Sequence, residues 1–406
     1  MITITDKEKC CGCSACMSIC PVNAITMTPD SQGFLYPAVN TETCINCGKC
    51  EAVCPILSPT PEREHEQEAY LLQHKDSEIL RDSTSGGAFT AIAKSILDKG
   101  GVVFGAGYDE GFRVIHKYAE DYESLHAFRN SKYVQSDKRE CFSEVKGFLE
   151  EGRYVLFSGT PCEAEGLVNF LGELSGAEHL LISDIVCRAT PSPAVWQAYI
   201  NLQMKKNEHS ILDFRFRDKA KFGYLYSQFA VVRDKNSLYE GIETNMFLRA
   251  FFSNVCDRPS CYSCKFRKRY RVCDFTLWDC WDASQFTHDS RKFDPNAGIT
   301  RMLVHSERGR KILPDVLTQC TYTKISPDDA VKYSSREMFC PVPKDEERYR
   351  KFWESFSDDP EGTLRRFFPK TAKTRIEALL RRIAFRTGMY SFVRGMYKKF
   401  FGECKR

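Results

Sequence analysis

The sequence lacks several features that would place it in a membrane, outside the cell or on nucleic acid. Its 406 residues contain no run of about 18 apolar residues, which a membrane-spanning helix requires. The start, MITITDKEKCC, has neither the basic residues nor the apolar stretch of a signal peptide, so we expect a cytoplasmic protein. The formal net charge of +4 is too small to indicate nucleic-acid binding, and we expect no nucleic-acid partner.

Cysteine, in contrast, is abundant, with 20 residues. A disulfide scaffold would need a short secreted chain, so metal binding is the better interpretation. Two runs share the spacing C-x2-C-x2-C-x3-C-P, typical of bacterial ferredoxins with two [4Fe–4S] clusters, in which the fourth cysteine of each run binds the other cluster. The predicted ligands are Cys10, Cys13, Cys16 and Cys54 for one cluster, and Cys44, Cys47, Cys50 and Cys20 for the second.

A pair of zinc sites is the alternative for these runs, since C-x2-C pairs also bind zinc. Zinc sites favour two separated cysteine pairs, whereas each run here carries four cysteines and ends in Cys-Pro. The segment between the runs predicts two short strands around a turn at residues 30–33. We therefore predict a ferredoxin-like N-terminal unit at residues 1–57, in which Cys11 is a surplus thiol.

The rest of the chain predicts a larger α/β domain. Residues 58–68, SPTPEREHEQE, are rich in proline and charge and are predicted to be a linker, followed by a domain at residues 69–345. Strands and helices alternate there, which indicates helices packed on a largely parallel or mixed sheet, and an α+β chain overall. The predicted strands lie at 68–75, 101–109, 153–159 and 179–187, and the helices at 86–100, 141–152 and 161–172.

Two turns of small residues lead into predicted helices, where ligands of open α/β sheets bind. Their backbone N–H groups could face a phosphate at a helix N-terminus, although such turns also cap helices that bind nothing. Beside a ferredoxin they suggest FAD, because a flavin converts single-electron transfers into two-electron chemistry. The residues are Ser85, Gly86 and Gly87 in the first turn, and Ser158, Gly159 and Thr160 in the second.

Five ordered segments carry a further pattern. They are STSGGAFTAIAKSILDKGGVVFGAGYD, NSKYVQSD, VLFSGTPCEAEGL, DIVCRATPSPAVW and RPSCYSCKFRKRYRVCDFTLWDCWD. Together they resemble the coenzyme F420 hydrogenase/dehydrogenase beta-subunit family, which also includes plant 7-hydroxymethyl chlorophyll a reductase. The resemblance implies FAD, an iron–sulfur cluster near it and two-electron exchange with an organic substrate. CRAT at 187–190 and WDCWD at 278–282 depart from the family's C-H-G and G-D-F-W-G, which leaves the substrate open.

Single residues of this domain are further candidates for the site. Lys132 and Tyr133 of NSKYVQSD match a family motif and are predicted to contact flavin or substrate, the alternative being a solvated lysine and a half-buried tyrosine. Asp279, together with Asp282, is a candidate acid/base group for proton transfer. Helix capping or pairing with an arginine is the alternative for both aspartates.

Cys261 and Cys264 form the one C-x2-C pair outside the N-terminal unit, and a cubane cluster requires four thiolates. Two completions are open, one from cysteines close in the sequence and one from the family segments. We favour the second, because its cysteines follow predicted strands whose ends are rigid and adjacent, and a zinc site is a further alternative. The local set is Cys256 with Cys273, and the favoured set is Cys162 with Cys187.

The C-terminal residues 346–406 are predicted to be a basic helical tail. From Thr363 to Arg406 there are thirteen Lys or Arg against two Glu. Apolar residues recur at helical spacing, which predicts a basic amphipathic helix that either lies on the inner face of the membrane or docks on protein. They are Ile376, Leu379, Leu380 and Ile383, then Phe392, Val393, Met396, Tyr397 and Phe400.

We therefore predict an iron–sulfur flavoprotein oxidoreductase that passes electrons between [4Fe–4S] clusters and FAD to reduce or oxidise a small organic molecule. The substrate would be an F420-like cofactor or a biosynthetic intermediate such as those of polysaccharide synthesis. A redox partner protein or ferredoxin is expected as well. The alternative is an electron-transfer subunit that has no substrate of its own and serves a partner enzyme.

Overall fold

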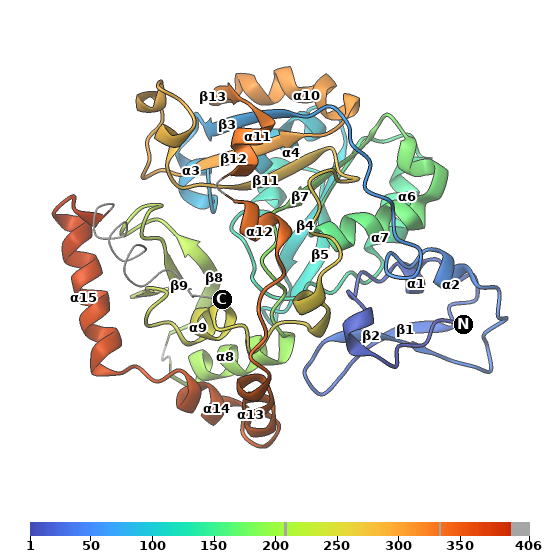
Figure 1. The fold of residues 1–406 in the computed structure, drawn as a ribbon, viewed down its shortest axis with the longest axis horizontal. Coiled ribbons are helices and arrows are strands. Elements are labelled where there is room, and N and C mark those ends of the chain that lie inside the picture. Colours follow the sequence, from blue (N-terminus) through green and yellow to red (C-terminus); the bar gives the residue numbers. More distant parts are fainter. Residues whose placement is uncertain (207–208, 333, 391–406) are drawn as a thin grey trace.

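A computed structural model describes residues 1–206, 209–332 and 334–390 (Figure 1). It has three parts: the N-terminal unit, an α/β domain around an eight-stranded sheet, and a small subdomain around a three-stranded sheet. In Figure 1 the N-terminal unit lies at the right and the small subdomain at the lower left, with the α/β domain between and above them.

The N-terminal unit is a strand hairpin with two short helices. Its elements are α1 (Ala15–Ser18), β1 (Ile25–Pro29), β2 (Leu35–Val39) and α2 (Lys49–Ala52). The strands pair antiparallel, which confirms the two predicted strands. The turn between them closes because the Asp30 carboxylate accepts hydrogen bonds from the backbone N–H groups of Gln32 and Phe34, and because Gly33 adopts φ +81°.

The α/β domain confirms the predicted mixed sheet, with strand order β13-β3-β12-β11-β7-β6-β4-β5. The four strands β11, β7, β6 and β4 are parallel, and the outer pairs are antiparallel. The C-terminal ends of the four parallel strands therefore meet at one edge of the sheet. The bounds are β3 (Glu68–His74), β4 (Val102–Tyr108), β5 (Val114–Ala119), β6 (Val155–Ser158), β7 (Leu180–Ile185), β11 (Phe275–Cys280), β12 (Ile299–Val304) and β13 (Cys320–Ile325).

Helices cover both faces of this sheet because its inner strands are apolar on both sides. Val103 and Leu156 pack under α4 and α10, whereas the neighbouring Val102 and Val155 pack under α6 and α7. The helices are α4 (Ala88–Leu97), α6 (Cys141–Glu150), α7 (Pro161–Leu171) and α10 (Glu307–Thr318), with the short helices α3 (Ser77–Asp82), α5 (Tyr122–Leu125), α11 (Pro327–Lys332) and α12 (Ser335–Phe339). All seven elements predicted from the sequence occur at their predicted places.

The small subdomain is built from two separate stretches of chain. Its elements are α8 (Pro193–Lys206), β8 (Ile211–Asp218), β9 (Gln228–Arg233), β10 (Leu238–Glu240), α9 (Met246–Phe252), α13 (Glu346–Asp358) and α14 (Pro360–Phe367). They enclose a core around the buried Trp196, whose Nε1 donates a hydrogen bond to the carbonyl of Phe112, at 2.8 Å. Phe352 and Leu364 are buried in this core, so the first part of the predicted tail docks on the protein's own subdomain, one of the two predicted alternatives. The apolar faces of α13 and α14 pack into the subdomain instead of leaving it.

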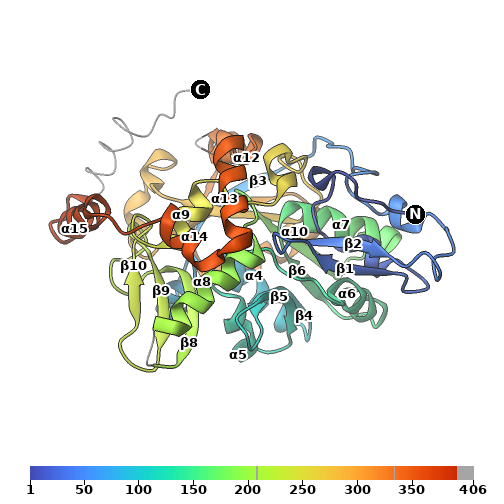
Figure 2. The same cartoon turned by 90° about the horizontal axis from the view of Figure 1, so that it is seen from below.

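Helix α15 (Ala372–Arg386) follows at the outer edge of the small subdomain (Figure 2). Among the helices that the structure describes, none is both long enough and apolar enough to cross a membrane. The second apolar run of the predicted tail, at residues 392–400, lies outside the described residues.

A single buried cation ties the N-terminal unit to the α/β domain. The guanidinium of Arg258 donates to the carbonyls of Cys10 and Leu35, at 2.7 and 3.0 Å, and to the side-chain oxygen of Gln135, at 3.0 Å. Arg258 is only 1% exposed and lies 4.2 Å from the ring centre of Tyr36. Three acceptors and an aromatic face therefore fix how the two parts meet.

The predicted linker lies along the α/β domain. Residues 58–67 have no helix or strand, and Glu68 already belongs to β3. The side chains of Asn169 and Lys268 donate to the carbonyls of Ser58 and Thr60, at 3.1 and 2.9 Å. The connection is thus bound to the domain surface at its first residues.

We predict that Arg258→Met lowers stability by about 3 kcal/mol, because the buried carbonyls lose their charged donor. Anaerobic thermal unfolding and limited proteolysis at residues 58–67 would measure this effect. Arg113→Met is the matched control, since Arg113 is 70% exposed and pairs with Asp109 at the surface, where pairs contribute about 0–1 kcal/mol. Equal melting temperatures for the two variants would contradict the role given to Arg258.

Candidate functional site

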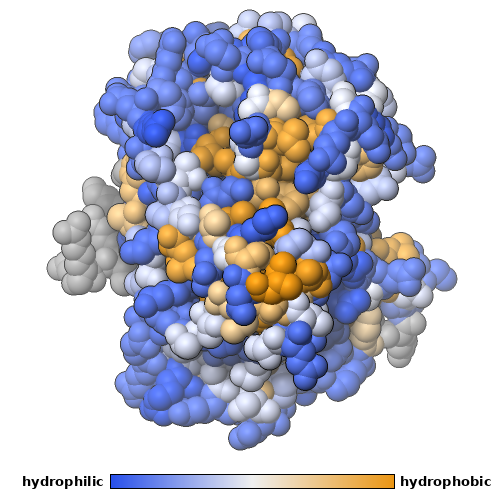
Figure 3. All heavy atoms as spheres, turned by 90° about the vertical axis from the view of Figure 1, so that its right-hand side faces the viewer, coloured by the Kyte–Doolittle hydropathy of each residue, from blue (hydrophilic) through white to orange (hydrophobic). Residues whose placement is uncertain are grey.

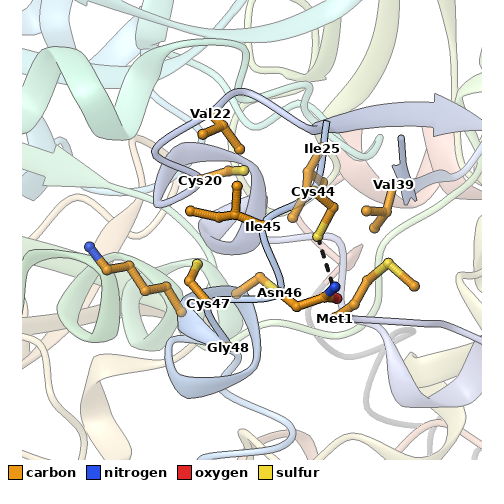
Figure 4. Close-up of a pocket in the computed structure, with 12 residues that line it drawn as sticks. Met1, Cys20, Val22, Ile25, Val39, Cys44, Ile45, Asn46, Cys47 and Gly48 are labelled. Carbon is orange, nitrogen blue, oxygen red and sulfur yellow. Dashed lines mark hydrogen bonds between the residues drawn. The ribbon is translucent and has the colours of Figure 1, made fainter. Parts of the chain in front are cut away.

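The first cysteine group lies in a surface cavity of the N-terminal unit. Figure 4 shows this cavity, which is lined by four cysteines of both runs and by apolar side chains. Cys47 is exposed, whereas Cys50 is buried. The cysteines are Cys20, Cys44, Cys47 and Cys50, and the apolar neighbours include Val22, Ile25, Val39 and Ile45. Four thiols in an apolar setting fit a [4Fe–4S] cluster, and Cys20 joins this group from the other run.

The second group lies on the side of the unit that faces the α/β domain. Its cavity is lined by Cys10, Cys11, Cys13, Cys16 and Cys54. Burial, together with the neighbouring thiols of Cys10 and Cys54, raises the pKa of Cys16 to about 12. Because metal ligands must be deprotonated, a bound cationic centre is what would hold such a thiol as thiolate.

The third group gathers at the C-terminal edge of the large sheet. Cys162 lies in the first turn of α7 and Cys187 follows β7, while Cys261 and Cys264 belong to the 3-10 turn Pro259–Ser263 and its end. Burial raises the pKa of Cys187, and the thiols of Cys261, Cys162 and Cys264 raise it further, so the four side chains lie within electrostatic range of one another. The backbone N–H of Arg258 donates to the carbonyl of Thr190, at 2.9 Å, and holds the turn over the strand end.

The two other candidate cysteines do not join this group. Cys256 is buried in the core around Trp196. Cys273 is buried in the core under α6 and α7, where its sulfur contacts the hydroxyl of Thr276 at 3.4 Å. The structure thus brings Cys162 and Cys187, rather than the local pair, to Cys261 and Cys264.

Cys11, surplus in the sequence pattern, connects the second and third groups. Its thiol lies beside those of Cys13 and Cys162, and the interaction with Cys13 raises the pKa of Cys11 well above its usual range. A side chain at Gly166 of α7 would come within 2.8 Å of the Cys13 sulfur. The glycine therefore permits the close approach of the two cysteine groups.

None of these groups has the geometry of a single-ion site. In the described ranges, no three or more His, Cys, Asp or Glu side chains are arranged to hold one metal ion. Thiolates on a single zinc would all lie about 2.3 Å from it.

A polar and aromatic group lies at the same sheet edge, on the side of β11 and β12. Arg217 donates from Nη1 to one carboxylate oxygen of Asp279, and the Tyr224 hydroxyl donates to the other, both at 2.9 Å. The Tyr224 ring stacks on Trp281, with centroids 4.6 Å apart, and the Arg217 guanidinium lies 4.7 Å from the Trp281 ring centre. Burial alone would lower the pKa of Arg217, but the Asp279 carboxylate outweighs it and raises this pKa.

The guanidinium of Arg217 has hydrogen-bonding capacity left for a ligand. Its buried Nη2 has no partner within hydrogen-bonding distance in the described part of the chain. Tyr133 lies beside Arg217, and burial raises the pKa of its hydroxyl. Lys219 donates to the carbonyl of Ser85 at 2.9 Å, and burial lowers the pKa of Lys219 to about 7. The group can therefore offer a cation, hydroxyls and aromatic rings to a planar, polar ligand.

The contacts of three predicted site residues differ from those expected from the sequence. The Lys132 ammonium donates to the carbonyls of Ala127 and Arg129, at 2.6 and 2.9 Å, so the structure does not bring it to Tyr133 and Asp279. Asp279 is paired with Arg217, and Asp282 accepts from the backbone N–H of Ser284 at 3.0 Å. For the two aspartates, pairing and capping, the alternatives to acid/base chemistry, are what the geometry favours.

The two small-residue turns use most of their backbone donors internally. Gly159 donates to the carbonyl of Ser183, and Thr160 donates to the carboxylate of Glu163, which closes a capping box. A phosphate at Ser158–Thr160 would therefore compete with Glu163 for the backbone N–H of Thr160, and the ligand role of this turn stays a prediction. In the first turn Gly86 donates to the Thr300 hydroxyl at 2.8 Å. Gly87 begins α4 with no side-chain cap.

Comparison with known protein families gives two matches, one to the N-terminal unit and one to a region that follows it in the chain. Residues 9–56 match a 4Fe-4S dicluster domain, and residues 152–329 match the C terminus of the coenzyme F420 hydrogenase/dehydrogenase beta subunit. The chain therefore combines a 4Fe-4S dicluster domain with a region that matches the coenzyme F420 hydrogenase/dehydrogenase beta-subunit family. The N-terminal unit is a ferredoxin-type unit, and the protein is an iron–sulfur electron-transfer protein.

A search of curated proteins found no match. A solved structure similar to this chain is a chain of the F420-reducing [NiFe] hydrogenase complex from Methanosarcina barkeri, with 14% identity and a TM-score of 0.46. The match covers 72% of this chain and 92% of that chain.

Sequence reasoning missed Arg217, Tyr224 and Trp281. They lie on or after β8 and β11, strands of two different sheets, and only the fold brings them together. The mixed basic and aromatic segment RFRDKAKFGY at 215–224 was the available signal.

Gly86 provides a test of how tightly this edge is packed. A side chain there would lie 2.3 Å from the Leu72 carbonyl and 2.5 Å from the Thr300 nitrogen, so we expect Gly86→Ala to lower stability by about 1–3 kcal/mol. Gly147→Ala is the matched control, because nothing lies within 4 Å and α6 should gain stability. Thermal unfolding compares the two, and equal shifts would show that the loop can move.

Proposed function

We propose that this chain is an iron–sulfur flavoprotein oxidoreductase that passes electrons between [4Fe–4S] clusters and FAD and reduces or oxidises a small organic substrate. One observation carries the proposal. Three cysteine groups follow one another from the exposed Cys47 to the C-terminal edge of the large sheet, where Arg217 and Trp281 lie. Such a series suits a route for electrons between the surface and a buried redox centre.

The surface end of this route suits contact with a redox partner. Exposed apolar residues of the N-terminal unit surround the first cysteine group, and apolar side chains gather on that face of the molecule (Figure 3). They include Met1, Val22, Ile45 and Leu57. Partner proteins bind exposed apolar patches of this kind, and we propose a ferredoxin or another redox protein as the partner.

The middle of the route is formed by Cys11 and Arg258. Cys11 contacts the thiols of Cys13 and Cys162, which we propose as ligands of different clusters. Arg258 donates to the Cys10 sulfur at 3.4 Å, and the thiols of Cys10, Cys11 and Cys261 raise its pKa against burial. A buried cation beside both clusters would favour their reduced, more negative states.

The inner end of the route suits a flavin. FAD, when bound, would exchange single electrons with a cluster and electron pairs with the substrate. The uncapped start of α4 at Gly87, the unused Nη2 of Arg217 and the stacked rings of Tyr224 and Trp281 are suited to a charged, aromatic cofactor. We propose that they hold it, with Tyr133 next to the cofactor or substrate.

An electron-transfer subunit without its own substrate is the second candidate. The exposure of Cys47 favours it, since electrons could leave the chain there as readily as they arrive. The membrane contact predicted for the tail stays a proposal and rests on the surface of α15. Cytoplasmic location likewise stays a proposal.

The flavin content of the purified protein distinguishes the flavoprotein oxidoreductase from the electron-transfer subunit. We expect anaerobically purified protein to release about one FAD per chain on denaturation. Trp281→Leu should lower the flavin content several-fold at constant iron, because stacking is lost. Tyr322→Leu, at an exposed ring on β13, is the control. Full iron without flavin in the unaltered protein would favour the electron-transfer subunit.

The third cluster is tested by iron content. We expect Cys162→Ala and Cys187→Ala each to lose about four of about twelve irons per chain. Cys256→Ala and Cys273→Ala should keep all of them, because these side chains lie in other cores. Iron measurement with electron paramagnetic resonance would report the loss. Constant iron in the first two variants, or zinc in the unaltered protein, would refute the assignment.

A further inference from the structure

Helix α15 turns its apolar side to the solvent. Four large aliphatic residues recur at helical spacing and share one face of the helix. Ile376, Leu379, Leu380 and Ile383 are 58%, 56%, 58% and 49% exposed. We call this set the aliphatic stripe. An amphipathic helix that served only to complete its own domain would bury these residues.

The opposite side of α15 is the one that docks on the small subdomain. Ala378 and Ala384 are buried there, and the ring of Phe385 meets that of Phe222 with centroids 5.6 Å apart. The start of the helix is held as well, because Arg249 donates to the carbonyl of Pro369 at 2.7 Å. The subdomain thus fixes the helix with the aliphatic stripe outward, at the edge of the molecule (Figure 2).

Positive charge flanks the aliphatic stripe. Arg375, Arg382 and Arg386 are exposed along one side of it, and Lys373 is exposed on the other. The single acidic residue of the helix, Glu377, accepts a hydrogen bond from Arg381 at 2.8 Å and is thereby neutralised. An aliphatic face with cationic borders complements the surface of an anionic bilayer, where side chains enter the acyl region and cations reach the phosphates.

We propose that α15 binds the surface of an anionic phospholipid bilayer through its aliphatic stripe, which makes the protein a peripheral membrane protein. A second copy of the chain fits this face less well. In a two-fold contact the same surface meets itself, so two sets of basic residues would be brought together. The proposal is independent of the flavin and of the third cluster.

Co-sedimentation of the full-length protein with vesicles tests the proposal. The vesicles contain phosphatidylcholine alone or with about one third phosphatidylglycerol, in low and high salt. We expect binding to the anionic vesicles only. Replacing Ile376, Leu379, Leu380 and Ile383 together by Ser should weaken it at least about 10-fold, because their apolar surface no longer enters the bilayer. Arg375→Gln, Arg382→Gln and Arg386→Gln together should weaken it by a similar factor.

Two controls keep the result tied to α15. Leu212→Ser, at a 60% exposed position on β8, should bind vesicles like the unaltered protein. All variants keep residues 391–406, and equal iron content and circular dichroism would show that they fold. Unchanged binding of the stripe variant would overturn the proposal. So would a dimer that the stripe variant dissociates while neither protein binds vesicles, since the stripe would then be an interface between copies.

Discussion

The buried guanidinium of Arg258 is the interaction on which the arrangement of the cysteine groups depends. A charge removed from water destabilises the protein unless acceptors surround it, and here the acceptors come from Cys10, Leu35 and Gln135. Two of them belong to the N-terminal unit and one to the α/β domain. The cation therefore finds its partners in one relative placement of the two parts, and that placement brings Cys11 to Cys162.

Local rules explain how much of the fold was predictable. The hydrophobic runs of β4, β6 and β7, and the helices that follow them, could be predicted from residues within one element. The cysteine ligands of the N-terminal unit could also be predicted locally, because the spacing within one short run of residues determines the loop that surrounds a cluster. The small subdomain was not predictable, because Trp196 and Phe352 share a core across more than 150 residues of sequence.

The candidate site likewise contains residues that could be predicted from the sequence and residues that only the fold brings together. The choice of Cys162 and Cys187 over the local pair came from the expectation that strand ends meet at one edge, and the structure places them there. The turn at Ser158–Thr160 was interpreted as a ligand site because the sequence shows its small residues but not which acceptors use their donors. Glu163 takes one donor, and the neighbouring strand β7 takes another. Arg217 and Asp279 meet only because the second sheet folds against the first.

The division of the small subdomain into two stretches of chain has a consequence for biosynthesis. While the ribosome is still making residues 253–345, α8, α9 and the three-stranded sheet are already present but lack the aromatic residues of α13 and α14 that cover them. The aromatic rings around Trp196 stay exposed until α13 and α14 have left the ribosome and can cover them. A nascent chain in this interval presents an open apolar surface, on which chaperones act and from which aggregation starts.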